Sequence, residues 1–363
     1  MTRSIKSDRK ARAKNMGETV PDKAKAAIRH GGNLGKARLM FPEAPEPWID
    51  LSTGINPHSY PHSPIPASAF ARLPEPSAAE ELKQLAAAHF GAPSARHVTL
   101  SPGTQMLMPL LAQIAIDRGA HNGAVLSPAY AEHARTARMA GLTVTEVENI
   151  SELSTYGYIV VVNPNNPDGR VTNRDALLTL ARARGREGGF VVVDEAFIET
   201  GVADSLADAT SDDALVVLRS FGKFYGMAGV RLGFAIAHPD IAAELEARLG
   251  PWAVSGPALH IATEALADKA WQSSMRLRLA QEARRLNEML KKAGLKIAGG
   301  TSLFTLVRDE RAKALFNRLG RRGILVRIFD ERPDDMRLGL PGSEAEWQRL
   351  EEALLAFSHP SKV

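Results

Sequence analysis

The sequence of 363 residues contains no cysteine. This absence excludes disulfide bonds, metal sites built from thiolates, and catalysis by a cysteine nucleophile. No run of about 18 apolar residues occurs, so no transmembrane helix is predicted, and the N-terminus lacks the apolar stretch of a secretory signal. We therefore expect a cytoplasmic protein without a membrane partner, and we assign no metal ligands.

Acidic residues are scarce at the N-terminus, although the whole chain has a formal net charge of only +4. Residues 1–29 contain nine Lys and Arg against three Asp and Glu, and no aromatic residue. Such a basic arm can bind nucleic acid, but this one is too short for a helix-turn-helix domain. We predict a flexible extension and no nucleic-acid partner.

Hydrophobic residues make up 44% of the chain and charged residues 24%, which is typical of a globular protein. Between residues 95 and 240, β-branched runs alternate with amphipathic stretches, a pattern that predicts an α/β fold with a parallel sheet covered on both faces. Several runs are apolar without alternation, as expected for strands buried on both faces. The predicted strands are 97–100, 123–126, 143–147, 158–162, 190–193, 214–218 and 232–237.

The pattern changes after a long helix predicted over 261–293. The elements that follow predict a small α+β unit, which the N-terminal segment through Pro57 is expected to join; they are strands at 303–307, 324–327 and 336–340 and helices at 311–321 and from 343 onward. The length also favours one large and one smaller domain. The predicted division is an extension of residues 1–29, a small domain of 30–60 and 265–363, and a large domain of 61–264.

One lysine occupies an unusual position, in a glycine-rich turn directly after an apolar strand. In Ser220-Phe-Gly-Lys223-Phe, a lysine in apolar surroundings loses its proton more easily than in water and can form a Schiff base with a carbonyl cofactor. The hydroxyl of Ser220 and the cation of Arg231 would suit a phosphate dianion. A surface lysine in a loop explains this window equally well.

Two further windows favour the chemical interpretation. Asn166, in Asn163-Pro-Asn-Asn166-Pro-Asp-Gly169, follows a predicted strand at the sheet edge where ligands of open α/β sheets bind. Asp194 ends a fully apolar strand, where a carboxylate is costly unless a cation pairs with it. A protonated pyridine nitrogen would be such a partner, and it would keep the ring an electron sink.

Together, Asn166-Pro-x-Gly, Asp194-Glu-Ala-Phe and Ser220-x-x-Lys223 with Arg231 resemble the fold-type I enzymes that use pyridoxal 5′-phosphate, in the same order and at similar spacing. The resemblance implies a large domain with a mostly parallel central sheet covered by helices, plus a small α+β domain. The roles that it implies are Lys223 as the covalent attachment, Asp194 on the pyridine nitrogen, Asn166 on the ring hydroxyl, Ser220 and Arg231 on the cofactor phosphate, Gly103, Thr104 and Gln105 in the phosphate-cradling turn, Tyr130 stacked on the ring, and Arg337 on the substrate carboxylate.

Within these enzymes, the chain is most similar to the threonine-phosphate decarboxylases of cobalamin biosynthesis and to the related histidinol-phosphate aminotransferases. The similarity lies in His30-Gly-Gly-Asn, in the window containing Gly54 and Asn56, and in Arg219-Ser-Phe-Gly-Lys223-Phe. It implies that His30, Gly54 and Asn56 bind substrate. Many relatives have Tyr in place of Phe197, and a Tyr in place of Leu73 that reaches the partner subunit's cofactor phosphate, so both hydrogen bonds are missing here.

The resemblance therefore implies decarboxylation of O-phospho-L-threonine to (R)-1-amino-2-propanol phosphate by a homodimer. Transamination of histidinol phosphate or another amino acid is the alternative, because the residues alone do not show which bond of the substrate breaks. Arg327 and His30 are candidate ligands of the substrate phosphate, although a surface arginine and a solvated or capping histidine are open alternatives.

Overall fold

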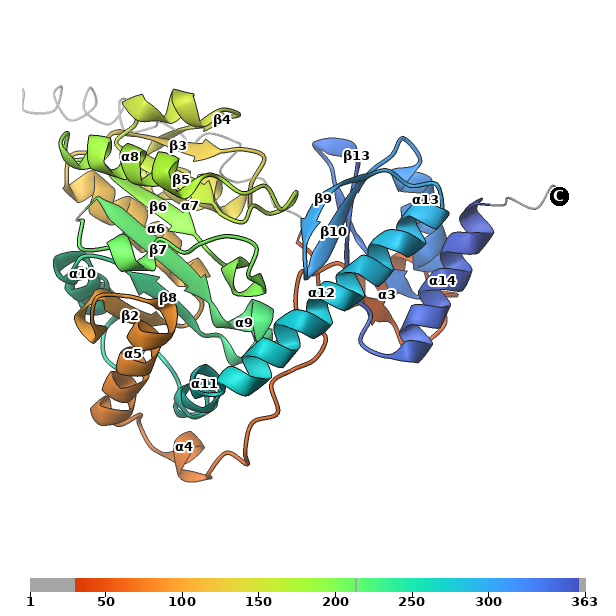
Figure 1. Ribbon diagram of the computed structural model, residues 1–363, viewed down its shortest axis with the longest axis horizontal. Coiled ribbons are helices and arrows are strands. Elements are labelled where there is room, and N and C mark those ends of the chain that lie inside the picture. Colours follow the sequence, from red (N-terminus) through yellow and green to blue (C-terminus); the bar gives the residue numbers. More distant parts are fainter. Residues whose placement is uncertain (1–29, 213, 359–363) are drawn as a thin grey trace, which may run out of the picture.

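The computed structural model describes residues 30–212 and 214–358 of the chain, so the predicted basic extension lies outside the described residues. Its ribbon contains a large sheet with helices and a smaller unit, joined by one long helix (Figure 1). No helix in the described ranges is both long and apolar enough to cross a membrane.

All seven strands predicted between residues 95 and 240 are present and form one sheet. In the order β2-β8-β7-β6-β5-β3-β4, they are Val98–Ser101, Gly233–Ile236, Leu215–Ser220, Phe190–Asp194, Tyr158–Val162, Asn122–Leu126 and Thr143–Val147. The strands from β7 to β4 pair in parallel, whereas β8 is antiparallel to both of its neighbours. The sheet is thus mostly parallel, as predicted. The exception arises because a one-turn helix, α9 (Phe221–Phe224), rather than a crossover helix, follows β7.

The central strands are buried on both faces because helices cover each side of the sheet. Consecutive residues of a strand point to opposite faces, so Val192 of β6 joins the apolar cluster on one side and Val191 the cluster on the other. The first face is covered by α6 (Thr104–Asp117), α7 (Glu132–Ala140) and α10 (Pro239–Leu249). The second is covered by α5 (Pro76–Phe90), α8 (Arg174–Gly185) and α11 (Gly256–Ala267). A four-residue helix, α4 (Ser68–Ala71), precedes α5.

The smaller unit contains an antiparallel sheet of order β12-β13-β10-β9 and a two-stranded parallel pair. The four strands are Arg327–Phe329, Arg332–Gly339, Phe304–Arg308 and Ile297–Thr301. In the pair, β1 (Ile49–Asp50) lies beside β11 (Ile324–Leu325), so the N-terminal segment packs against this unit. Helices α3 (Leu34–Met40), α13 (Ala312–Arg321) and α14 (Glu344–Ser358) complete it. The residue boundaries of the two predicted domains stay a prediction.

Two predicted elements are divided in the structure. The strand predicted at 324–327 breaks at Val326, since its halves join different sheets. The helix predicted over 261–293 breaks at Asp268, whose carboxylate accepts a 2.9 Å hydrogen bond from the Trp271 N–H and caps α12 (Lys269–Lys292).

Strand β9 was not predicted because its Ala-Gly-Gly run lacks β-branched residues. These glycines permit a close backbone approach: a Cβ at Gly299 would collide with the Asp168 carbonyl, and a Cβ at Gly169 with the Gly300 carbonyl. Gly169 also has a φ of +72°, which favours glycine. The turn after β5 is thereby held against the smaller unit.

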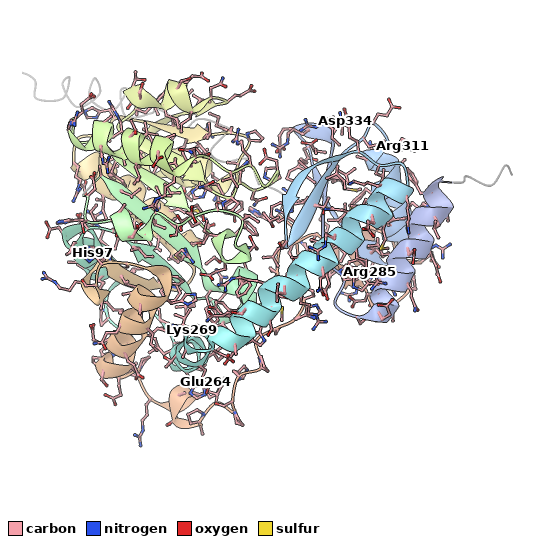
Figure 2. All side chains as sticks on the ribbon, in the orientation of Figure 1. His97, Glu264, Lys269, Arg285, Arg311 and Asp334 are labelled. Atoms are coloured by element: carbon pink, nitrogen blue, oxygen red, sulfur yellow. The ribbon has the colours of Figure 1, made fainter. Side chains whose placement is uncertain are left out.

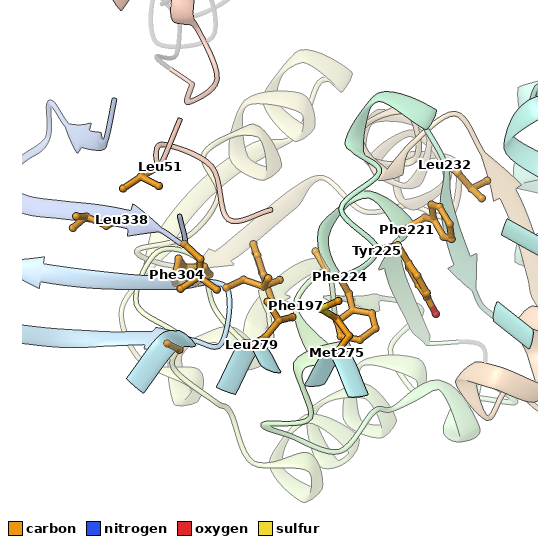
Figure 3. Packing of buried hydrophobic residues seen from close by; sticks show 14 of the residues in the cluster. Leu51, Phe197, Phe221, Phe224, Tyr225, Leu232, Met275, Leu279, Phe304 and Leu338 are labelled. Atoms are coloured by element: carbon orange, nitrogen blue, oxygen red, sulfur yellow. The ribbon is translucent and has the colours of Figure 1, made fainter. Parts of the chain in front are cut away.

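Helix α12 joins the two parts of the molecule (Figure 1). Its buried side chains Met275 and Leu279 lie between Phe224 of the large part and Phe304 of the smaller one (Figure 3). Farther along α12 lies Arg285 (Figure 2). Its guanidinium donates two 2.6 Å hydrogen bonds to the carboxylate of Glu344 on α14. One helix therefore packs into the cores of both parts.

Candidate active site

A cavity of about 260 Å³ opens at the carboxyl ends of β5, β6 and β7, beside the N-terminus of α6. This is where ligands of open α/β sheets bind. Twelve of the predicted site residues line it: His30, Gly54, Gly103, Thr104, Gln105, Tyr130, Asn166, Asp194, Ser220, Lys223, Arg231 and Arg337. The structure thus brings together side chains that are more than 300 residues apart in the sequence.

Lys223 lies in the cavity wall because β7 ends at Ser220 and the chain turns at once into α9. Burial, reinforced by the nearby cation of Arg337, lowers the pKa of Lys223 to about 8, while the Asp194 carboxylate acts in the opposite direction. The ammonium also lies 5.9 Å from the ring centre of Phe197. A much larger fraction of this amine is therefore neutral near pH 7 than for an exposed lysine, as a nucleophilic lysine requires.

Another group of lining residues is suited to a phosphate. Gly103 and Thr104 begin α6, whose free N–H groups and positive dipole end attract anions. The Arg231 guanidinium lies against this turn so closely that a Cβ at Gly103 would be 2.6 Å from its Nη2 atom. Gly233 is constrained too, since a Cβ there would be 2.5 Å from the Thr104 nitrogen. With Ser220 beside them, these groups combine donors and a cation on one side of the cavity.

Asp194 is buried at the end of β6, and both of its carboxylate oxygens have partners. Oδ1 accepts a 3.0 Å hydrogen bond from the Ala196 N–H, and Oδ2 lies 2.8 Å from Nε2 of His133. His133 is buried as well, and its Nδ1 has no hydrogen-bond partner. Sequence reasoning missed this histidine. The signal was present in the spacing, because His133 follows Tyr130 by three residues in the turn that begins α7, and the two rings meet edge to face with centroids 6.0 Å apart.

Tyr130 begins a chain of polar contacts across the mouth of the cavity. Its hydroxyl donates to Oε1 of Gln105 at 3.2 Å, and the Gln105 amide donates to Glu132 at 3.2 Å. The other oxygen of Glu132 lies 3.0 Å from Nε2 of His30. Burial, followed by the acidic neighbours Glu132 and Asp194, raises the pKa of Tyr130 to about 12, so its hydroxyl stays protonated. Glu132 is a second residue that the sequence patterns did not reveal.

Arg337 reaches the cavity from β13, in the smaller unit. It is buried, and it donates a hydrogen bond to Oδ1 of Asn166 and a 3.1 Å hydrogen bond to the Ser52 carbonyl. Burial and the neighbouring Arg327 lower the pKa of Arg337 to about 10, so it remains a cation at neutral pH. Its Nε, which is also buried, has no partner. A buried guanidinium facing a cavity is suited to binding a carboxylate.

Gly54 lines the cavity. It has no side chain that could bind a ligand, and its role is to leave room for neighbouring rings. A Cβ there would lie 2.9 Å from the Phe304 ring and 3.1 Å from the Phe197 ring. These rings meet edge to face, with centroids 5.0 Å apart. A side chain at Gly54 would therefore displace the aromatic floor of the cavity.

Two predicted substrate ligands do not line this cavity. Asn56 is buried beside the lysine turn, where its amide donates to the Phe224 carbonyl and accepts from the His58 N–H. Its contact with substrate stays a prediction. Arg327 lines an adjoining groove of about 790 Å³, which shares His30 and Ser52 with the cavity. Its guanidinium stacks on Phe329 at 5.0 Å from the ring centre.

The model of one protein family, aminotransferase class I and II, matches residues 46–354. The chain belongs to this family. Its curated relatives include the threonine-phosphate decarboxylase of Pseudomonas aeruginosa, which is 42% identical over 92% of this chain and 99% of its own length. The enzyme of the same name from Sinorhizobium sp. is 38% identical over 91% and 98%.

Among solved structures, histidinol-phosphate aminotransferase from Sinorhizobium meliloti, in complex with pyridoxal-5′-phosphate, superposes with a TM-score of 0.79 and 19% identity. The likeness covers 94% of this chain and 98% of that one. It shows the fold.

The cavity of this family member fits pyridoxal phosphate on its own geometry. A weakly basic lysine suits an aldehyde, the turn of Gly103 with Arg231 suits a phosphate, and the buried Asp194 carboxylate suits a protonated ring nitrogen. These three groups converge on one space of about 260 Å³.

Proposed function

We propose that this chain is a pyridoxal-phosphate-dependent carboxy-lyase that decarboxylates O-phospho-L-threonine. The product, (R)-1-amino-2-propanol phosphate, supplies the linker of the nucleotide loop in cobalamin biosynthesis. The observation that carries the proposal is the similarity to two threonine-phosphate decarboxylases over more than nine-tenths of the chain, at 42% and 38% identity.

In this proposal, different residues of the cavity bind different parts of the cofactor. Lys223 would hold the cofactor covalently, and Ser220, Arg231 and the N-terminus of α6 would bind its phosphate. Tyr130 would pack on the ring, Asn166 would meet the ring hydroxyl, and Asp194 would meet the ring nitrogen. The bound cofactor supplies an electron sink for the bond that breaks at Cα.

The reaction releases carbon dioxide from Cα and adds one proton at that carbon. Arg337 binds the carboxylate and orients its bond to Cα, and the loss of the carboxylate leaves the electron pair of that bond on the substrate side. The Lys223 amine, with a pKa of about 8, is suited to carry the proton to Cα. No acceptor keto acid takes part in this balance, whereas transamination requires one.

A decarboxylation assay without a keto acid tests the proposal directly. We expect stoichiometric carbon dioxide and aminopropanol phosphate from O-phospho-L-threonine, detected by isotope release and mass spectrometry. Histidinol phosphate with 2-oxoglutarate is the comparison, because the fold is shared with a histidinol-phosphate aminotransferase. If that mixture formed glutamate and phosphothreonine released no carbon dioxide, the enzyme would be an aminotransferase and not a decarboxylase.

Arg327 is proposed to bind the substrate phosphate. It opposes Arg337 across the β12–β13 pair, so two arginines face neighbouring spaces: the carboxylate would lie at Arg337 and the phosphate at Arg327. A hydrogen bond to a charged group is worth roughly 1.5–3 kcal/mol. We therefore expect Arg327→Ala to lower kcat/KM for phosphothreonine by about 10- to 150-fold, with cofactor binding unchanged in a spectral titration.

Arg332→Ala is the matched control for this prediction, since Arg332 stacks on the same Phe329 ring at 4.6 Å but does not line the groove. Unphosphorylated threonine, which has no phosphate, should be a poor substrate that is indifferent to Arg327→Ala. If Arg327→Ala lowered kcat/KM equally for both substrates, or if both variants lowered it equally, Arg327 would support the structure and would not bind the substrate phosphate.

We also propose that the protein forms a homodimer. Phe70, Leu73 and Trp252 expose 69%, 62% and 56% of their surface, and two adjoining grooves that share Pro74 connect Leu73 with Trp252. Exposed apolar patches of this kind mark interaction sites, and closed two-fold dimers are the commonest assembly. At such an interface Leu73 could offer apolar contact but no hydrogen bond to a phosphate.

We expect light scattering to give the mass of a dimer. Leu73→Asp, which places a charge in the exposed apolar patch, should shift the protein toward the monomer. Leu355→Asp on α14, where Leu355 is 50% exposed, should leave the mass unchanged. A wild-type protein that is monomeric and fully active would contradict the proposed assembly.

A further inference from the structure

The backbone carbonyl groups of residues 223–226 accept hydrogen bonds from a segment that is distant in the sequence, although the Lys223 carbonyl also accepts a 3.4 Å hydrogen bond from the Gly226 N–H. Helix α9 has four residues, and the last carbonyl groups of any helix lack donors from within the helix. Asn56 meets the last two of these groups: its backbone N–H donates to the Lys223 carbonyl at 3.0 Å, and its side-chain amide donates to the Phe224 carbonyl at 2.8 Å. The first of these carbonyls belongs to Lys223 itself, the residue that we assign to catalysis.

The next two carbonyls are met by the same short segment. The Tyr60 N–H donates to the Tyr225 carbonyl at 2.9 Å, and the Ser59 hydroxyl donates to the Gly226 carbonyl at 2.8 Å. Four consecutive carbonyl groups, 223–226, thus accept hydrogen bonds from residues 56–60. Gly226, at φ +66°, allows this approach, because a Cβ there would lie 2.7 Å from the Asn56 carbonyl oxygen.

Residues 56–60 are in turn fixed to α12. Nε2 of His58 lies 2.9 Å from both carboxylate oxygens of Glu282. The Tyr60 hydroxyl donates to Asp268 at 3.3 Å, and its ring meets Trp271 edge to face, with centroids 5.1 Å apart. The segment therefore lies between the lysine-bearing turn and the helix that joins the two parts of the molecule.

We propose that residues 56–60 form a positioning clamp that holds the backbone of Lys223 and fixes its amine relative to Asp194 and Arg337. The clamp rests on the proposed function of Lys223. Asn56 is its central residue, because it is buried, uses both amide atoms and contacts two consecutive carbonyls. Asn56 is thus a positioning residue and does not touch the cavity. A displacement of about 1 Å at a reacting group can cost on the order of 100-fold in rate.

Asn56→Ala tests the clamp in the holoenzyme, with Asn287→Ala as the matched control. Asn287 likewise has a hydrogen-bonded side chain, whose amide oxygen accepts from the Thr305 hydroxyl at 2.7 Å, but it is not in contact with the lysine turn. For Asn56→Ala we expect amide hydrogen exchange in residues 221–228 to accelerate by about tenfold or more, while the rest of the chain keeps its protection. We also expect kcat to fall at least about tenfold with KM nearly unchanged.

The cofactor-free protein provides a second measurement. Because burial depresses the basicity of Lys223, loosening the turn should move the pH midpoint of its acylation upward toward that of an ordinary lysine. The control variant should show none of these changes. Unchanged exchange in 221–228, or faster exchange spread over the whole chain, would overturn the clamp.

Ser59→Ala removes one bond at an exposed residue, so it keeps the proposal testable if Asn56→Ala does not fold. In Ser59→Ala, the rate of amide hydrogen exchange in residues 221–228 should rise about 2- to 10-fold. An unchanged rate would refute the clamp. Hydrogen exchange needs no substrate. A wild-type protein that releases no carbon dioxide from phosphothreonine would contradict the proposed function, and the exchange result would still decide the clamp.

Discussion

Lys223→Ala is expected to abolish both turnover and the borohydride-reducible bond between protein and cofactor. The lysine amine is the only group in the cavity lining with a pKa lowered to about 8 by burial, and it lies at the carboxyl end of β7 where a ligand can reach it. Alanine supplies neither the nucleophile nor the proton carrier. Absorbance after borohydride treatment and mass spectrometry of the 221–228 peptide measure the loss.

Two variants make this result specific. Lys223→Arg keeps a cation of similar length, so it should lose the covalent bond and the activity while retaining some phosphate-dependent cofactor affinity. Lys83→Ala removes another partly buried lysine, paired with Glu246 at 2.8 Å on the outer helices, and should behave as wild type. A reducible cofactor linkage that survives in Lys223→Ala would place the attachment at a different residue.

Much of the site could be predicted because its residues follow strands that are themselves easy to recognise. Runs such as Val191-Val192-Val193 predict strands buried on both faces, and such strands must align side by side in a parallel sheet. Their carboxyl ends then meet at one edge. Asn166, Asp194 and Lys223 each follow one of these runs, so local patterns were sufficient to bring them together.

The residues that the sequence did not reveal act through tertiary contacts. His133 supports Asp194 from helix α7, 61 residues away in the sequence, and Glu132 joins His30 to Gln105. Asn56 illustrates the same limit. Its position in a family-like window predicts a substrate ligand, whereas the structure places it outside the cavity lining. Whether a side chain faces a cavity depends on backbone direction, which no local pattern encodes.

One helix prediction was imprecise, and one strand was not predicted. A helical pattern continues through residues 261–293, but a single capping carboxylate at Asp268 separates α11 from α12 and allows them to take different directions. The four paired positions between β9 and β10 depend on glycines that fit against the turn at Gly169. At β9, tertiary packing thus overrides the average preference of the residues, whereas at Asp268 a local cap begins a new helix.

The carboxylate of Asp194 is buried, and both of its oxygens have hydrogen-bond partners. Both oxygens are already oriented, one by the Ala196 N–H and the other by His133 at 2.8 Å. A buried carboxylate is stable only with a cation or several donors, and a protonated pyridine nitrogen adds such a cation. The reciprocal effect is the important one, because the carboxylate raises the proton affinity of the ring nitrogen and thereby its capacity to accept electrons.

We therefore expect Asp194→Asn to retain bound cofactor but to lose on the order of 100- to 1,000-fold in kcat, the range typical of removing one electrostatic stabiliser from a transition state. Asparagine keeps the shape and an oxygen for the Ala196 N–H, so packing should change little, and thermal unfolding should confirm a folded protein. Asp208→Asn, at a surface ion pair with Arg174, controls for the same change of residue. The ring nitrogen should lose its proton in the variant, which a nitrogen chemical shift measured on isotopically labelled cofactor reports directly. A protonated ring in Asp194→Asn, with kcat near that of the wild type, would show that this carboxylate serves the fold and that another group keeps the electron sink charged.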